Sequence, residues 1–235
     1  MIKRQIPNLI TLGNLACGVL AVYFALWWRD PVVAALLVCG GIFLDFFDGL
    51  SARLLGVASP MGKELDSLAD VVTSGVAPAA ILYCITNITL YRVGMLWLAA
   101  IYLLIPLFAA YRLAKFNLDT RQTHSFLGLP VPSQALVWVG VALSAHSEAL
   151  TLNMGGVAAV LAVSVLLDVL MVSEMPLFSL KFNFKDLGWK TNSVQYIFLI
   201  GCVVVIALLH DWIAISAIIL WYLLLSLITQ RKHDA

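Results

Sequence analysis

Eight apolar stretches, each close to the length of a membrane span, leave this chain few ways to fold. A helix needs about 20 mostly apolar residues to cross the hydrocarbon core of a bilayer, and 62% of this sequence is hydrophobic while only 11% is charged. Backbone amides in lipid must be hydrogen-bonded within the protein, which favours helices. The sequence therefore predicts one all-α domain, residues 1–235, folded as a polytopic membrane bundle of about eight helices. The expected spans are 8–28, 32–54, 66–87, 95–113, 133–147, 155–173, 194–210 and 212–230.

Lysine and arginine are distributed unevenly between the two ends of these spans. If the N-terminus lies in the cytoplasm, only Arg29 and Arg92 of the 14 lysines and arginines fall on the opposite side. Cytoplasmic loops of membrane proteins collect Lys and Arg, so we expect both termini in the cytoplasm and the chain in the cell's inner (cytoplasmic) membrane. The formal net charge of +1 gives no reason to expect a nucleic-acid partner.

The window 44–70, "LDFFDGLSARLLGVASPMGKELDSLAD", gathers carboxylates inside this apolar chain. Asp45 and Asp48 share one face of a helix, and Asp66 and Asp70 share one face of the next. The short connection between the two helices makes them antiparallel neighbours, so the acidic faces converge. Oxygen ligands without His or Cys favour hard cations such as Mg²⁺ or Mn²⁺. Two such ions suit the chemistry of a diphosphate.

Small residues lie on the same two faces as the acids. Gly49, Ala52 and Gly62 leave room beside the carboxylates for a bulky ligand. Close helix packing of the small-xxx-small kind is the alternative explanation for them. Arg53, one turn beyond Gly49, offers a planar guanidinium to a phosphate oxygen.

The complete spacing resembles the signature of the CDP-alcohol phosphatidyltransferase family. The resemblance implies a membrane enzyme with a six-helix core, often a homodimer, that transfers a phosphatidyl group from a CDP-linked lipid to an alcohol and releases CMP. It implies that the four aspartates bind two divalent cations and that Asp70 also acts as the catalytic base. It further implies that the nucleotide site is shaped by Gly49, Ala52, Arg53 and Gly62. With eight spans expected, the last two would be additions to the core. The matching pattern is Asp45-x2-Asp48-Gly49-x2-Ala52-Arg53-x8-Gly62-x3-Asp66-x3-Asp70.

Further stretches are similar to the serine-transferring branch of that family, namely "IPNLITLGNLACGVLA", "ELDSLADVVTSGVAPA", "YRLAKFNLDTR" and "FLGLPVPSQA". This resemblance implies CDP-diacylglycerol and L-serine as substrates, with membrane lipids around the protein. Recognition of the serine carboxylate requires a cation near the acceptor, and Arg112 and Arg121 are the candidates. The positive-inside rule alone would also place them there.

A polar stripe enters the first span at Asn8, Thr11 and Asn14. We expect these side chains to contact the nucleotide, with helix capping and interhelical hydrogen bonding as the alternative. Asp168 is a charge inside the sixth span to which the sequence assigns no role. The segment 174–193 mixes Phe, Trp and Lys and is expected to lie at the membrane interface.

Three other functions compete with this interpretation. Intramembrane aspartates also line the ion paths of cation or proton transporters, although here they gather near one face of the bilayer. Aspartate-rich polyprenyl transferases use magnesium with diphosphates but lack this spacing of arginine and glycines. Transfer to glycerol 3-phosphate or inositol keeps the chemistry and changes only the acceptor.

Overall fold

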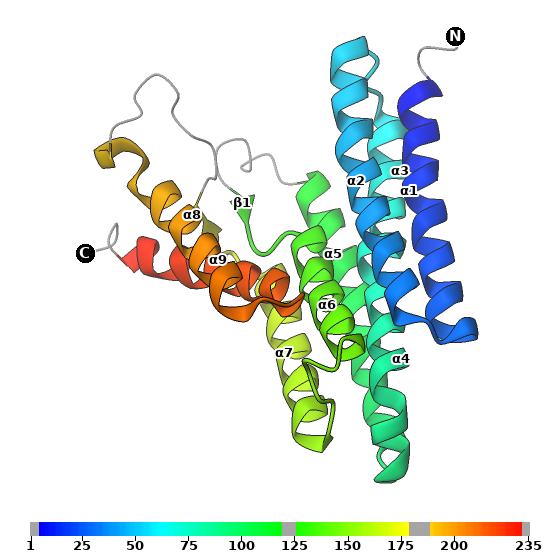
Figure 1. Ribbon diagram of the computed structural model, residues 1–235. Helices are drawn as coiled ribbons and strands as arrows, with labels where there is room; N and C mark the ends of the chain where they lie inside the picture. Colours follow the sequence, from blue (N-terminus) through cyan, green and yellow to red (C-terminus); the bar gives the residue numbers. More distant parts are fainter. Residues whose placement is uncertain (1–4, 119–125, 179–188, 232–235) are drawn as a thin grey trace.

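The computed structural model describes residues 5–118, 126–178 and 189–231 as a bundle of helices (Figure 1). The α-helices are α1 (Gln5–Tyr23), α2 (Pro31–Leu55), α3 (Pro60–Asp70), α4 (Ala77–Arg92), α5 (Leu104–Leu118), α6 (Val131–His146), α7 (Met154–Val172), α8 (Trp189–Leu209) and α9 (Ile213–Arg231). Two π-helical segments, η2 (Phe24–Trp28) and η3 (Val71–Val76), and one 3₁₀ segment, η4 (Leu96–Leu103), extend them. Two short strands, β1 (Phe126–Leu127) and β2 (Pro176–Leu177), complete the described elements.

Six helical segments in the described part of the chain are long and apolar enough to cross a membrane. The predicted all-α polytopic fold is therefore confirmed, and the protein is an integral membrane protein. The expected fifth and eighth spans are also helical, as α6 with 16 residues and as the apolar part of α9, Ile213–Thr229. Both are shorter than the about 20 residues that a membrane span needs. The six segments are Gln5–Trp28, Pro31–Leu55, Pro60–Arg92, Leu96–Leu118, Met154–Val172 and Asn192–Leu209.

Local sequence signals fix the turn between α2 and α3. Gly56 ends α2 in the left-handed conformation, at φ +64°, which glycine adopts without steric cost. Ser59 then caps α3, and its hydroxyl accepts a hydrogen bond from the backbone N–H of Gly62. Pro60 occupies the first turn of α3, where its missing N–H is not needed. The two acid-bearing helices are thereby joined by a short turn.

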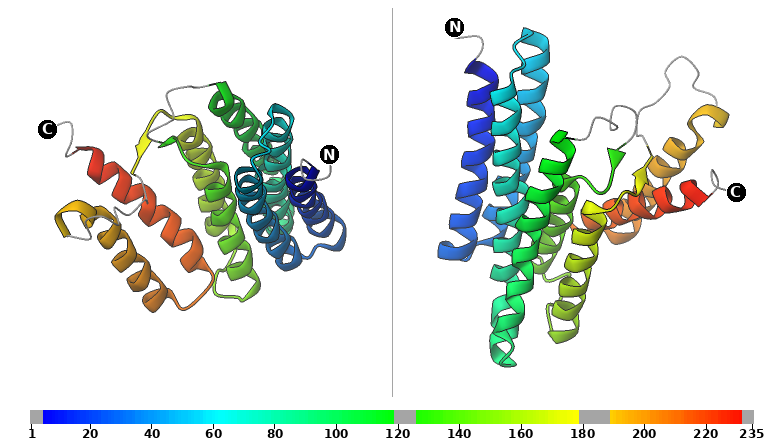
Figure 2. Two further views of the ribbon diagram at one scale, coloured as in Figure 1. Left: turned by 90° about the horizontal axis from the view of Figure 1, so that it is seen from above. Right: turned by 180° about the vertical axis from the view of Figure 1, so that it is seen from behind.

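The α1, α2 and α3 helices run side by side at one edge of the bundle (Figures 1 and 2). The α3, η3 and α4 segments form one continuous rod, Pro60–Arg92, of 33 residues. α5, α6 and α7 pack against the other side of this rod. α9 packs on α6 and contributes Leu223 to the buried core, and α8 packs on the other side of α9 (Figure 2).

Two clusters of buried side chains hold the helices together. The larger one joins α4, η4, α5, α6, α7 and α9 through large residues such as Tyr102, Trp138 and Leu167. The smaller one joins α1, α2, α4 and α6 and is rich in alanine, including Ala21 and Ala34. Small residues allow helix backbones to approach closely in a membrane. This cluster therefore packs the four helices tightly toward the end of α1 and the start of α2.

Gly128 and its neighbours tie the start of α6 to the end of α7. β1 pairs with β2 in antiparallel register, with Phe126 opposite Leu177. Gly128 N–H donates to the carbonyl of Met175 at 2.9 Å, and Leu129 N–H donates to that of Leu170 at 3.2 Å. This backbone connection fixes the height of α6 relative to α7.

Candidate functional site

Three carboxylates meet where α2 faces α3. One oxygen each of Asp45, Asp48 and Asp66 lies within 4.8 Å of the other two. Asp48 is buried and the other two are half-buried. Asp66 Oδ1 is buried without a hydrogen-bond partner in the described part of the chain, which is costly unless something else satisfies it. Three converging carboxylates with an unpaired buried oxygen fit a hard divalent cation.

Asp70 lies one turn beyond Asp66 and outside that group of three. Its side chain interacts with that of Asp45, and it accepts a hydrogen bond from Asn14 Nδ2 at 3.4 Å. Asp70 and Arg112 are each 8% exposed and interact electrostatically. Asp70 is thus placed between the carboxylate group and a buried cation on α5.

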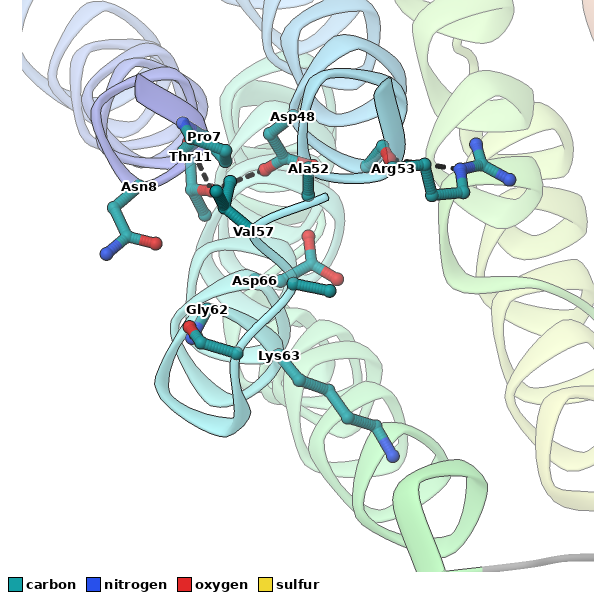
Figure 3. Close-up of a pocket in the computed structure, with 13 residues that line it drawn as sticks. Pro7, Asn8, Thr11, Asp48, Ala52, Arg53, Val57, Gly62, Lys63 and Asp66 are labelled. Atoms are coloured by element: carbon teal, nitrogen blue, oxygen red, sulfur yellow. Dashed lines mark hydrogen bonds between the residues drawn. The ribbon is translucent and has the colours of Figure 1, made fainter. Parts of the chain in front are cut away.

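A pocket of about 280 Å³ opens beside the carboxylates, between the start of α1, the end of α2 and the start of α3 (Figure 3). Asp48 and Asp66 form part of its wall. The Thr11 hydroxyl donates to Asp48 Oδ2 and so fixes one carboxylate at the pocket. The lining residues are Pro7, Asn8, Thr11, Asp48, Gly49, Ala52, Arg53, Val57, Ala58, Ser59, Gly62, Lys63 and Asp66.

The small residues of the motif border this pocket. A Cβ atom at Gly49 would meet no other atom within 4 Å, so this glycine leaves open space and does not serve helix packing. At Gly62 a Cβ would lie 3.3 Å from both Asn8 Oδ1 and Ser59 Oγ. Ala52 lines the same pocket. The structure therefore brings these three positions together around one cavity.

Two predicted nucleotide contacts are placed differently from the rest. Arg53 lies at the pocket, but its Nε donates to the Gly49 carbonyl at 3.0 Å and its guanidinium points away from Asp66 (Figure 3). Asn14 does not line the pocket; it is fully buried, and its carbonyl accepts a hydrogen bond from the Thr73 hydroxyl at 3.0 Å. Asn14 thus contacts Asp70 from the interior of the bundle and not from the pocket.

Arg121, the second candidate for the acceptor carboxylate, lies outside the described residues. The sequence analysis overlooked Lys63, which lines the pocket and donates from Nζ to the Asn117 carbonyl at 3.0 Å. Its position directly after Gly62 in the motif is the signal that could have identified it. Thr73 was also overlooked, because no local spacing connects it to Asn14.

Comparison with known proteins identifies the family. Residues 4–171 match the CDP-alcohol phosphatidyltransferase family. The chain belongs to this family. The resemblance drawn from the acidic motif is therefore confirmed.

Relatives of this CDP-alcohol phosphatidyltransferase are found in several organisms. A Bacillus subtilis protein is 42% identical over 129 residues, which cover 55% of this chain and 70% of the relative. A Helicobacter pylori protein is 38% identical over 188 residues, covering 78% and 74% of the two chains. A Methanocaldococcus jannaschii protein is 36% identical over 135 residues, covering 57% and 59%. All three are named CDP-diacylglycerol–serine O-phosphatidyltransferase.

The family match ends within α7, at residue 171. It includes α1, α2, the α3–α4 rod, α5, α6 and nearly all of α7, which together make six helical rods. α8 and α9 lie beyond it. This boundary agrees with the expectation that the last two helices are additions to a six-helix core.

Proposed function

We propose that this membrane enzyme transfers the phosphatidyl group of CDP-diacylglycerol to the hydroxyl of L-serine, forming phosphatidylserine and CMP. The single observation that carries the proposal is that Asp48 and Asp66 belong both to the three-carboxylate group and to the wall of the pocket. A diphosphate bound there would lie against the acids, with its nucleotide among the small residues. The names of the relatives support serine as the acceptor.

Two divalent cations, Mg²⁺ or Mn²⁺, fit the acidic residues. Asp45, Asp48 and Asp66 would hold them together with Asp70, which interacts with Asp45. The unpaired Asp66 Oδ1 is a ready ligand atom. When bound, such ions would offset the charge of the diphosphate and stabilise the leaving group. We therefore expect transfer to stop after exhaustive chelation and to return when Mg²⁺ or Mn²⁺ is added.

Asp70 is proposed as the general base. It takes the proton of the serine hydroxyl while that oxygen attacks the phosphorus atom attached to diacylglycerol. The bond from this phosphorus to the CMP phosphate oxygen breaks, and CMP leaves. Asn14 donates to Asp70 Oδ1 and so orients the carboxylate that accepts the proton. Arg112 interacts with Asp70 and is placed to bind the serine carboxylate beside the base.

Thr11 and Asn8 of α1 are proposed nucleotide contacts, together with Gly49, Ala52 and Gly62. All five line the pocket. Arg53, at the rim, would reach a phosphate by rotating its side chain from the Gly49 carbonyl. Thr11 already donates to Asp48, so its contribution would include fixing that carboxylate next to the diphosphate.

The pocket end of the bundle is proposed to face the cytoplasm. Arg53, Lys63, Arg112 and Lys115 lie toward that end in the described part of the chain, which agrees with the positive-inside rule. We also propose a homodimer. The mass of the purified protein in detergent, measured by light scattering, tests that assignment.

Release of CMP from CDP-diacylglycerol by the purified protein tests the function. L-serine, glycerol 3-phosphate and inositol are compared in parallel as acceptors. We expect serine to drive release and the other two to give little above the rate without acceptor. Turnover with glycerol 3-phosphate and none with serine would reject the acceptor assignment, while no CMP release with any alcohol would reject the transferase assignment.

A further inference from the structure

A buried polar pair joins α6 and α7, away from the pocket already described. Gln134 Nε2 donates to Asp168 Oδ1 at 2.7 Å. Gln134 is 0% exposed and Asp168 is 1% exposed. The remaining oxygens, Gln134 Oε1 and Asp168 Oδ2, are buried without a hydrogen-bond partner. Two acceptors on one buried pair therefore lack a donor among the residues that the structure describes.

The pair lies at the same end of the bundle as the catalytic acids. Gln134 is in the first turn of α6 and Asp168 is in the last two turns of α7. The β1–β2 connection holds these two helix ends together. α5 packs on α7, and η3, which begins directly after Asp70, packs on both α5 and α6.

We propose that Asp168 and Gln134 bind the ammonium group of the amino-acid acceptor, while Arg112 binds its carboxylate. The inference rests on the proposed function, because it takes a zwitterionic alcohol as the acceptor. An ammonium group has three donors and no acceptor, which complements two unpaired oxygens. A carboxylate enclosed away from water needs a cationic partner, and the structure describes no basic side chain that bonds to Asp168.

This arrangement distinguishes serine from alcohols that lack an amine. Glycerol 3-phosphate and inositol have no cation to satisfy Asp168. Their binding would leave a buried carboxylate unpaired, which a polar site rejects strongly. The neighbouring side chains of α5 and α7 must shift to admit the acceptor, because the pair is enclosed in this structure. The same enclosure removes water and strengthens the charge pair.

A structural role is the competing explanation. A proton on Asp168 Oδ2 could be donated to Gln134 Oε1, so that the two side chains would simply bridge α6 and α7. Asp168→Asn separates the two explanations. Asparagine keeps the shape and donates to Gln134 Oε1, so it preserves a structural bridge, but it has no charge for an ammonium group.

The experiment measures CMP release by purified wild type and Asp168→Asn with two acceptors, L-serine and 3-hydroxypropanoate, which is serine without its amine. We expect wild type to prefer serine by kcat/KM, and Asp168→Asn to lower that preference by about 100-fold. The KM for CDP-diacylglycerol should change less than about twofold, since only the acceptor is contacted. Gln134→Met, which removes the second acceptor at similar volume, should raise the serine KM about 10-fold.

Ser164→Ala is the matched control. Ser164 is also fully buried on α7, one turn before Asp168, and its hydroxyl bonds only to the Leu161 carbonyl among the described contacts. It should leave the preference for serine unchanged. An unchanged preference in Asp168→Asn would overturn the inference and leave the pair as a structural bridge. If serine did not stimulate CMP release by the wild-type enzyme, the proposed function itself would be rejected. That result is distinct from an unchanged preference in Asp168→Asn.

Discussion

Asp70 illustrates how single side chains acquire different roles within one acidic motif. It is 8% exposed, accepts a hydrogen bond from Asn14 and interacts with Arg112. Asp66, one turn earlier, faces the pocket and carries an unpaired oxygen. The motif spacing makes the two acids equivalent, whereas their contacts do not. This difference agrees with the proposal that the deeper residue is the base and that the shallower one is a cation ligand.

Asp70→Asn tests the base at this scale. The substitution keeps the volume and the hydrogen bond to Asn14 but removes the proton acceptor. We expect kcat to fall by about 100- to 10,000-fold, with an unchanged melting temperature in detergent. Glu64→Gln is the control, because Glu64 is an exposed acid on the same helix and its loss should leave kcat unchanged. Near-normal turnover in Asp70→Asn would exclude the base assignment.

Gly49→Leu tests whether the pocket holds the CDP-lipid. A Cβ at Gly49 meets nothing within 4 Å, so a larger side chain at this position begins in open space beside the cavity. Leucine also favours the helix over glycine by about 1 kcal/mol. We expect the KM for CDP-diacylglycerol to rise about 10-fold, the serine KM to change little, and the melting temperature to stay level or rise. A lower melting temperature with normal KM values would instead show that Gly49 serves helix packing.

At the scale of elements, the approach of α1, α2 and η3 decides how the acids are supported. Thr73 of η3 is fully buried and donates to the Asn14 carbonyl. A Cβ at Gly18 of α1 would lie 2.8 Å from Thr73 Cα, and one at Gly41 of α2 would lie 2.9 Å from Asn14 Oδ1. The two glycines allow the three segments to meet. This contact places Asn14 against Asp70.

Gly41→Ala should destabilise the bundle by about 1–3 kcal/mol, because its new methyl group would overlap with Thr73 Cγ2. Thr73→Ser removes that methyl and keeps the hydroxyl, so the double variant Gly41→Ala/Thr73→Ser should recover part of the loss. Gly18→Ala is the contrasting case, since its Cβ would meet Thr73 backbone atoms and Thr73→Ser offers no relief. Melting temperatures in detergent of wild type, the three single variants and the two double variants measure the coupling. Equal recovery in both double variants would contradict this packing.

At the scale of the whole molecule, the Pro60–Arg92 rod relates the site to the membrane. Its 33 residues correspond to about 50 Å of helix, which exceeds the hydrocarbon core of about 30 Å. The two ends of the rod therefore lie on opposite sides of the bilayer. The pocket lies on the same side of the bilayer as Pro60, because α3 forms part of the pocket wall.

Single cysteines at the two ends of the rod test the proposed orientation. Glu64→Cys lies near the pocket, and Tyr91→Cys lies at the opposite end, where the tyrosine is 74% exposed. The four native cysteines are first replaced by alanine. In intact cells stripped of any outer membrane, a membrane-impermeant maleimide should label Tyr91→Cys, and should label Glu64→Cys only after permeabilisation. The reverse pattern would place the active site on the outer face.

The sequence by itself determined the class of fold, the helices and the residues of the motif. Apolar length and 3.6-residue periodicity are local properties, so α2, the α3–α4 rod and their acidic faces follow from spacing alone. The short turn at Gly56 and Ser59 is also local, and it brings Asp45, Asp48 and Asp66 together. Most of the candidate site was therefore predictable.

Only the tertiary structure decided which partners each polar side chain meets. Asn14 and Asp70 are 56 positions apart, and Gln134 and Asp168 are 34 apart. Such contacts depend on the rotation and the axial position of each helix relative to its neighbours. The packing of large and small side chains sets both for the whole bundle. The polar stripe of α1 shows the consequence, since Asn8 and Thr11 reach the pocket whereas Asn14 turns to Asp70.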